Sequence, residues 1–169
     1  FGGWAILVVY ENPSLTLNQL NIYQGLEALS PNRPLGIIDY MTIQLDNLYL
    51  ISNTGAKIGF IAWEGDSQLP TETFSVNNIA ISNAMNPINN VFNSTNSITG
   101  SNTLFNMDLV VYEIDNYVAI GDTSASITLS SSQDFIMINT VITKLNSQLP
   151  DATVVINNVA TLCNSREVN

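Results

Sequence analysis

The chain has 169 residues, enough for one domain with a buried core. Its 14 acidic and 4 basic residues give a net charge of −10, which repels phosphate backbones and anionic lipids and so excludes nucleic acid as a partner. The apolar fraction of 46% is too high for a disordered chain, and the 11% of charged residues leaves solubility to Asn, Ser and Thr. This polar but weakly charged composition indicates an extracellular protein.

Period-two alternation, the mark of half-buried strands, predicts the elements from the N-terminus onward. The run Trp4–Tyr10 is apolar on both sides and predicts a central strand covered on both faces, with Trp4 in the core. Residues 37–45 alternate and predict a strand. Residues 48–52 and 57–63 flank Asn53-Thr54-Gly55, whose Asn and Gly tolerate positive φ, and predict a hairpin.

The second half of the chain continues in the same way. An Asn-rich stretch over residues 77–102 predicts either a long irregular loop or short strands with Asn-rich corners, and Gly121-Asp122 predicts a turn. Strands are predicted at 105–112, 117–120, 124–129, 135–145 and 153–159. Many short strands favour an all-β antiparallel sandwich of jelly-roll type. We expect one such domain over residues 1–148, with 149–169 as a closing strand or the start of a following segment.

The residue inventory excludes several kinds of chemistry. Without histidine there is no Ser-His-Asp triad and almost no zinc site, and no glycine-rich phosphate loop follows a strand. The only cysteine, Cys163, excludes an internal disulfide and is expected either to pair outside this chain or to stay a free thiol. The longest apolar run is too short to cross a bilayer as a helix, so no membrane insertion is expected.

Carboxylates are the remaining chemical groups. Two of them across a cleft would suit glycoside hydrolysis, but acids at strand ends are more often turn formers, so no catalytic residue and no enzyme are predicted. Calcium takes hard oxygen ligands from loops, and the candidates are Glu64, Asp66, Asp115 and Asp122. Their spacing fits no calcium-loop pattern, and no other cofactor is expected. Asn93-Ser94-Thr95 matches a glycosylation acceptor.

Four stretches, in order over about residues 2–148, resemble a β domain of very large secreted adhesin-like proteins of Bacteroidetes. GGWAILVVYENPSLTLNQLNIYQGLEAL resembles that domain's AGW segment, and IGFIAWEGDSQLPTETFSVN resembles its AYEGD segment. NNVFNSTNS resembles a third, and FNMDLVVYEIDNYVAIGDTSASITLSSSQDFIMINTVIT resembles the GFD and ATSA stretches. In that family further β segments precede the AGW strand.

The resemblance implies a non-enzymatic adhesive or structural module of a large surface-attached protein or filament, as in gliding-motility adhesins exported by the type IX system. It implies an extracellular, cell-surface location and a sandwich whose N-terminal strands are supplied from elsewhere. Expected partners are other segments of the same polypeptide or neighbouring subunits, joined by strand addition, and surface glycans or outer-membrane proteins. The alternative is a calcium-assisted, lectin-like carbohydrate-binding module with exposed aromatic rings beside acids.

Overall fold

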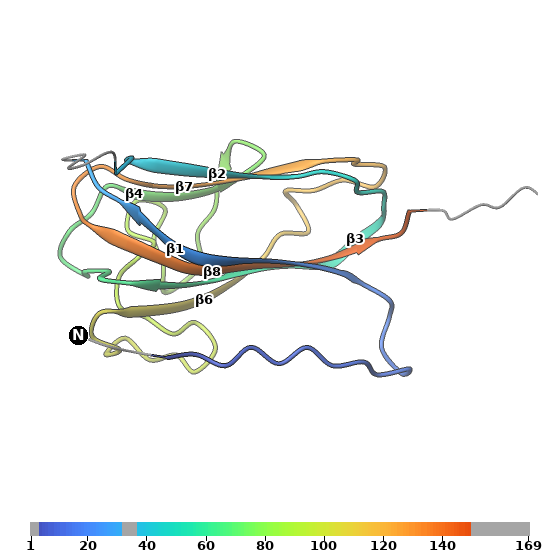
Figure 1. Cartoon of the computed structure of the whole chain (residues 1–169), viewed down its shortest axis with the longest axis horizontal. Coiled ribbons are helices and arrows are strands. Elements are labelled where there is room, and N and C mark those ends of the chain that lie inside the picture. The colour runs from blue at the N-terminus through green and yellow to red at the C-terminus, as the bar shows by residue number, and fades with distance from the viewer. Residues whose placement is uncertain (1–3, 32–36, 150–169) are drawn as a thin grey trace, which may run out of the picture.

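The computed structural model of the chain describes residues 4–31 and 37–149. This part contains strands and no helix, and the strands form two antiparallel four-stranded sheets packed against each other (Figure 1). The predicted all-β sandwich is therefore confirmed. In the described residues no helix has the length and apolarity needed to cross a membrane.

Each sheet combines strands from both halves of the chain. Sheet A has the order β1-β8-β3-β6, with bounds β1 (Gln19–Leu29), β8 (Ile136–Ser147), β3 (Leu50–Trp63) and β6 (Met107–Glu113). Sheet B has the order β2-β7-β4-β5, with bounds β2 (Tyr40–Leu45), β7 (Ala125–Ser131), β4 (Glu72–Val76) and β5 (Ile79–Ala80). The antiparallel pairs β1·β8, β2·β7, β3·β6 and β4·β5 are those of a long hairpin wrapped over itself, which is the jelly-roll arrangement.

The core lies between the sheets and is built from every second residue of each strand. Phe60 of β3 packs edge-on against Phe74 of β4 and against Phe92 of the loop between β5 and β6. The ring centroids are 5.3 and 5.1 Å from that of Phe60. Tyr112 of β6 completes this aromatic cluster, 5.4 Å from Phe74. Edge-to-face pairs of this kind add to the free energy of burial, so the cluster fixes the spacing of the two sheets.

The segment Trp4–Tyr10, called the arm below, does not form the predicted central strand. It belongs to no strand, and its large side chains are exposed, from 41% for Leu7 to 82% for Trp4. The prediction of a covered strand with a buried Trp4 is therefore wrong for the described chain. A strand that is apolar on both sides needs a neighbour along its edge and cover on both faces, and the described residues provide neither.

The predicted hairpin around Asn53-Thr54-Gly55 is also wrong. β3 runs without reversal from Leu50 to Trp63, and its register against β8 shifts between Ser52 and Lys57. Gly55 takes a positive φ of 73° within this irregularity. Both flanking segments pair with β8 rather than with each other, so the Asn and Gly accommodate a bulge instead of a turn.

Most of the remaining predictions agree with the structure. β2, β6, β7 and β8 match predicted strands within a few residues, and the Asn-rich stretch is irregular apart from the two residues of β5. Residues 117–120 are turns rather than a strand, because Tyr117 N–H and Asp122 N–H donate to the carbonyls of Ile114 and Ala119. The predicted strand 153–159 and Cys163 lie outside the described residues.

Candidate functional site

Two buried carboxylates lie at one end of the sandwich, one from each sheet. Asp108 of β6 and Glu72 of β4 are both fully buried. Asp108 Oδ1 accepts hydrogen bonds from the backbone N–H groups of Asn93 and Thr95, at 3.0 and 2.9 Å. Glu72 Oε2 accepts one from Phe92 N–H at 3.1 Å. The two sheets therefore hold the same loop segment, residues 92–95, through one acid each.

Burial disfavours the charged form of both acids. Burial is the main cause that raises the pKa of Glu72 to about 9, and the nearby charges of Asp134, Asp108 and Asp66 also raise it. The hydrogen bond from Phe92 N–H acts in the opposite direction and lowers the pKa. Burial also raises the pKa of Asp108 to about 6, although the backbone N–H groups of residues 93–95 stabilise its carboxylate. Glu72 is thus a neutral carboxylic acid at neutral pH.

Gly65 is required beside these acids. A Cβ at this position would collide with Asp108 Oδ2 and with the carbonyl of Phe92, so no larger residue fits without moving the loop. The Gly65 carbonyl also accepts a hydrogen bond from Ser94 Oγ at 2.7 Å. The chain after β3 is therefore pressed against the loop that the two buried acids hold.

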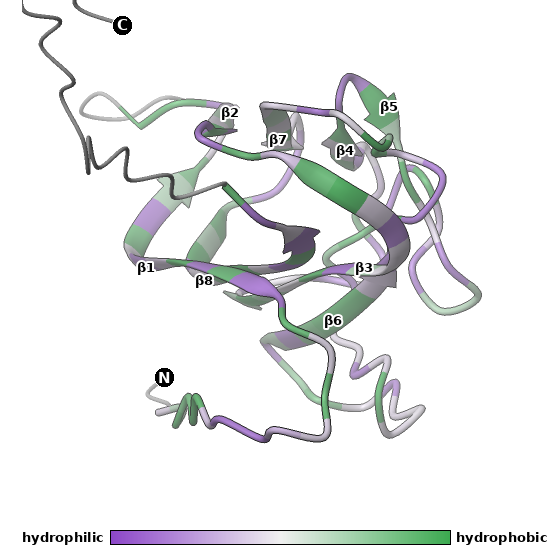
Figure 2. Ribbon diagram, turned by 90° about the vertical axis from the view of Figure 1, so that its right-hand side faces the viewer, coloured by the Kyte–Doolittle hydropathy of each residue, from purple (hydrophilic) through white to green (hydrophobic). Residues whose placement is uncertain are grey.

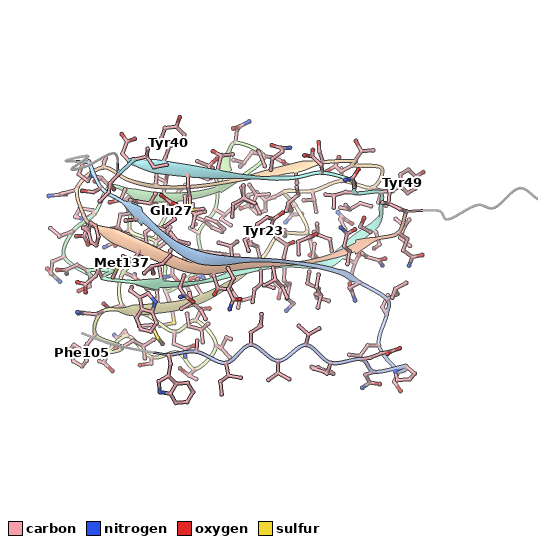
Figure 3. All side chains as sticks on the ribbon, viewed as in Figure 1. Tyr23, Glu27, Tyr40, Tyr49, Phe105 and Met137 are labelled. Atoms are coloured by element: carbon pink, nitrogen blue, oxygen red, sulfur yellow. The ribbon has the colours of Figure 1, made fainter. Side chains whose placement is uncertain are left out.

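A polar hollow of about 360 Å³ opens over this end of the molecule. Glu64, Asp66 and Asp134 supply its carboxylates. Phe105, which is 81% exposed and has a positive φ of 44°, lies at its rim and projects at the end of the sandwich in Figure 3. The hollow thus combines hydrogen-bonding groups with one flat, solvent-facing ring.

The structure brings together only two of the four predicted calcium ligands. Glu64 and Asp66 both line the hollow, whereas Asp115 and Asp122 lie at the other end of β3. There Asp115 Oδ2 accepts a hydrogen bond from Gly55 N–H at 3.2 Å, and Asp122 Oδ2 accepts one from Ala119 N–H at 2.8 Å. These two acids act as turn caps.

Within residues 4–31 and 37–149, no group of three acidic, histidine or cysteine side chains is placed to hold a metal ion. Calcium binding therefore stays a prediction. Sequence reasoning did not include Asp134 in the site, because it joins Glu64 and Asp66 only through the fold. The same reasoning missed the burial of Glu72 and Asp108, although each lies an even number of residues from inward-facing apolar residues of its own strand.

The glycosylation motif at Asn93 is not accessible. The Asn93 side chain is buried, and its Nδ2 donates to the carbonyl of Met85 at 2.8 Å. Asn93 Oδ1 in turn accepts hydrogen bonds from Asn86 and Thr95. The motif is therefore part of the internal hydrogen bonding of the loop.

The outer faces of the two sheets differ in chemistry. Sheet A presents half-buried apolar side chains from β3, β6 and β8: Ile61, Trp63, Met107, Leu109, Val111, Met137 and Ile142. Figure 2 shows hydrophobic, green stretches along β3 and β6. Sheet B presents hydroxyls that pair across its strands, Thr42 with Thr128 at 3.0 Å and Thr73 with Ser130 at 2.6 Å. Lys57 and Glu113, which form an ion pair, and Lys144 lie on the same outer face of sheet A, and the rest of that face resembles an interior surface.

The arm lies across this apolar outer face without packing on it. Residues Trp4–Leu7 and the face enclose a mainly apolar gap of about 380 Å³, with Gly59, Leu109, Val111 and Ile142 on the sheet side. Figures 1 and 3 show the arm running below sheet A as a separate layer. Within the described chain, residues 4–10 form no backbone hydrogen bond. The arm therefore lies beside the face with neither tight packing nor strand pairing.

The edges of the sheets differ in how they are closed. The edge of β6 is covered by the loop that precedes it through two backbone hydrogen bonds. Leu109 N–H donates to the carbonyl of Thr95 at 2.9 Å, and Ser97 N–H donates to the carbonyl of Leu109 at 3.0 Å. Along β1 and β2, on the other side of the sandwich, the described residues add no strand. A groove of about 220 Å³ opens between these two edges, lined by residues such as Tyr23, Leu26, Glu27, Met41 and Ile43.

Comparisons of the chain with models of protein families, with curated proteins and with solved structures found no match.

Proposed function

We propose that this chain is a non-enzymatic adhesive or structural module of a large secreted, surface-attached protein or filament. The observation that carries the proposal is the arm, a seven-residue apolar segment left exposed beside an apolar sheet face. An apolar surface of this extent is costly for a free monomer in water, and it is a usual feature of surfaces that pack against other protein. A module within a long polypeptide or fibre has such neighbours.

The surface chemistry of the rest of the molecule supports the same proposal. Sheet B carries a hydroxyl face, and only 11% of the chain is charged, as in the secreted proteins that the sequence resembles. The resemblance of four ordered stretches to gliding-motility adhesins supports a cell-surface location and export by the type IX system. Partners in this proposal are adjoining segments or subunits joined by strand addition, and glycans or outer-membrane proteins at the cell surface.

The test uses antibodies raised against the recombinant chain. We expect them to label intact cells of the producing organism, to lose that labelling after external protease, and to detect on immunoblots a polypeptide much larger than 18.4 kDa. Labelling only after the cells are permeabilised would overturn the surface assignment. A native polypeptide of the size of this chain would overturn its role as a module of a larger protein.

A second candidate function has one observation in its favour. Phe105 is an exposed ring beside the carboxylates of the hollow, which is the arrangement expected of a sugar-stacking site. Glycan-array binding that is lost in Phe105→Ala but kept in Tyr49→Ala, an exposed ring elsewhere, would support a carbohydrate-binding module. Loss of binding with chelator would add calcium to that function. Equal binding by the wild type and Phe105→Ala would exclude the hollow as the sugar site.

A further inference from the structure

We infer that the arm of one copy of this chain adds as a fifth strand to sheet A of a second copy, along the open edge of β1. This inference deepens the proposed function, on which it rests, by naming the donor segment, the acceptor edge and the partner. It starts from two features that are both incomplete within residues 4–31 and 37–149: an arm without backbone partners and an edge of β1 without a neighbouring strand.

The acceptor is selected by comparing the four sheet edges. The edge of β6 is already occupied by its loop, and β5 has only two residues. β2 has six residues, and its outer side chains, such as Thr42 and Gln44, continue the polar face of sheet B. β1 has eleven residues; its last, Leu29, forms a bridge with Ile38, and the ten before it are long enough to pair with the seven-residue arm.

The two-sided apolarity of the arm also matches β1. A strand beside β1 has one side toward the groove between β1 and β2, whose lining includes Leu26, Met41 and Ile43. Its other side extends the outer face of sheet A, next to Leu20 and Ile22, which are exposed in the single chain. Both sides of the added strand would therefore contact apolar side chains, whereas a strand beside β2 would place one side among hydroxyls.

The groove supports the same assignment. Figure 3 shows Tyr23 and Glu27 of β1 on the side that faces sheet B, where the groove opens. The set Ala5, Leu7 and Val9, on one side of the arm, is smaller than the set containing Trp4 and Tyr10. We assign the smaller set to the groove and the larger one to the outer face. The arm carries no charge, so it adds no repulsion against a chain of net charge −10.

The geometry of the linker favours a second copy over the same chain. Between the arm and β1, Asn12 forms a turn, accepting hydrogen bonds from Ser14 N–H at its side chain and from Leu15 N–H at its carbonyl. Beyond this turn the arm runs below the outer face of sheet A, away from the edge of its own β1, in both Figure 1 and Figure 2. The β1 edge of each copy is thus left to the arm of another copy. Donation of an arm from each copy to the next joins the copies head to tail.

The experiment disables donor and acceptor separately in the full chain. Val8→Pro removes the backbone N–H donor of residue 8 in the arm, which lies outside the sandwich. Val8→Thr is the control, because it keeps both the N–H and the carbonyl of residue 8. Leu26→Lys places a charge at the mouth of the groove, and Leu17→Lys makes the same change at another exposed leucine, in the linker. The oligomeric state is measured by analytical ultracentrifugation, and amide exchange of residues 4–10 is followed across the same concentrations.

The wild type and both controls are expected to form oligomers in which the amides of residues 4–10 exchange at least tenfold more slowly than in the monomer. Val8→Pro and Leu26→Lys are each expected to be monomeric. Their equimolar mixture should form a complex of two copies, because one variant keeps an intact arm and the other an intact edge.

Three other outcomes overturn the inference. A monomeric wild type with fast exchange in the arm means that no copy accepts it, and a monomeric wild type with a protected arm means that the chain uses its own edge. Oligomers that persist in Val8→Pro mean that the copies meet elsewhere. Surface labelling of cells together with a monomeric chain would leave the proposed function standing and point to another segment of the larger polypeptide as the acceptor.

Discussion

The two sheets are alike on their inner sides and different on their outer sides. Inside, each contributes alternating apolar residues and one buried acid, Asp108 from sheet A and Glu72 from sheet B, to the same loop. Outside, sheet A is mainly apolar and sheet B carries paired hydroxyls. The inner sides thus share the core and its loop anchor, whereas the outer sides differ in the surface that they offer to a partner.

The largest expected effect is a pH dependence of the free energy of unfolding, caused by Glu72 on the inner side of sheet B. The folded pKa of Glu72, about 9, lies above its ordinary value of 4.5, so between these values the folded protein binds more protons than the unfolded chain. The free energy of unfolding should therefore fall as the pH rises from about 5 to 9, by up to roughly 5 kcal/mol. Asp108, with a pKa of about 6, adds to the fall in the acidic part of this range.

Glu72→Gln should remove most of this dependence above pH 6.5, because glutamine is neutral and can still accept from Phe92 N–H. Urea unfolding of the wild type and the variant between pH 5 and 9 measures the difference. Glu11→Gln, in the exposed linker, controls for the loss of one acid. A wild-type stability that stays constant between pH 6.5 and 9 would show that Glu72 is not held neutral.

The second effect concerns the inner side of sheet A. Asp108→Ala leaves the backbone N–H groups of Asn93 and Thr95 without their acceptor, and we expect a loss of about 3 kcal/mol in the free energy of unfolding. Asp108→Asn keeps one acceptor oxygen and should lose less. Amide exchange should rise most in residues 93–97, the loop that covers the edge of β6. Equal stability of Asp108→Ala and the wild type would refute the anchoring role.

A smaller effect tests the outer face of sheet A at Gly59, where an added side chain would be crowded. Gly59 lies where an added Cβ would be 3.0 Å from the carbonyl oxygen of Val110 and 3.2 Å from Val111 Cγ2. Gly59→Ala should therefore cost about 1–2 kcal/mol by overpacking. Gly25→Ala, in β1 of the same sheet, meets no atom within 4 Å and should be neutral or slightly stabilising. Thermal unfolding of both variants distinguishes crowding from a general effect of removing glycine.

The smallest effect on stability comes from exchanging the chemistry of the two outer faces. Replacing Ile61, Leu109 and Val111 by Thr should change the free energy of unfolding by only about 1 kcal/mol, while reducing binding of a hydrophobic dye and raising solubility. Replacing Thr42, Thr73 and Thr128 by Val should do the reverse on sheet B. Unchanged dye binding in both sets would show that the outer faces do not differ functionally.

Alternation along the chain was enough to predict the fold class and the strands β2, β6, β7 and β8, because their inward and outward residues differ. It missed β1, where a bulge between Gln24 and Glu27 breaks the period, and β4, whose first inward residue is the acid Glu72. The hairpin at Asn53-Thr54-Gly55 was predicted from local turn chemistry, which cannot tell a turn from a bulge when a third strand pairs with both sides.

The candidate site was less predictable. Glu64 and Asp66 are neighbours in sequence and share the hollow, but Asp134 reaches it only through the wrapping of the chain. The burial of Asp108 could have been inferred, since residues 108, 110 and 112 share one side of β6. The fate of the arm could not be read from its residues, because a run that is apolar on both sides indicates cover without saying which chain supplies it.

The wrapped topology also determines how the module would respond to a pulling force. The chain enters β1 at Gln19, which pairs with Leu145 close to the point where the chain leaves β8. Entry and exit are therefore side by side at one end of sheet A. Tension applied there would open the β1–β8 ladder like a zipper, one pair at a time, instead of shearing all its hydrogen bonds together. In a fibre of such modules, this ladder would yield first and lengthen the fibre at low force.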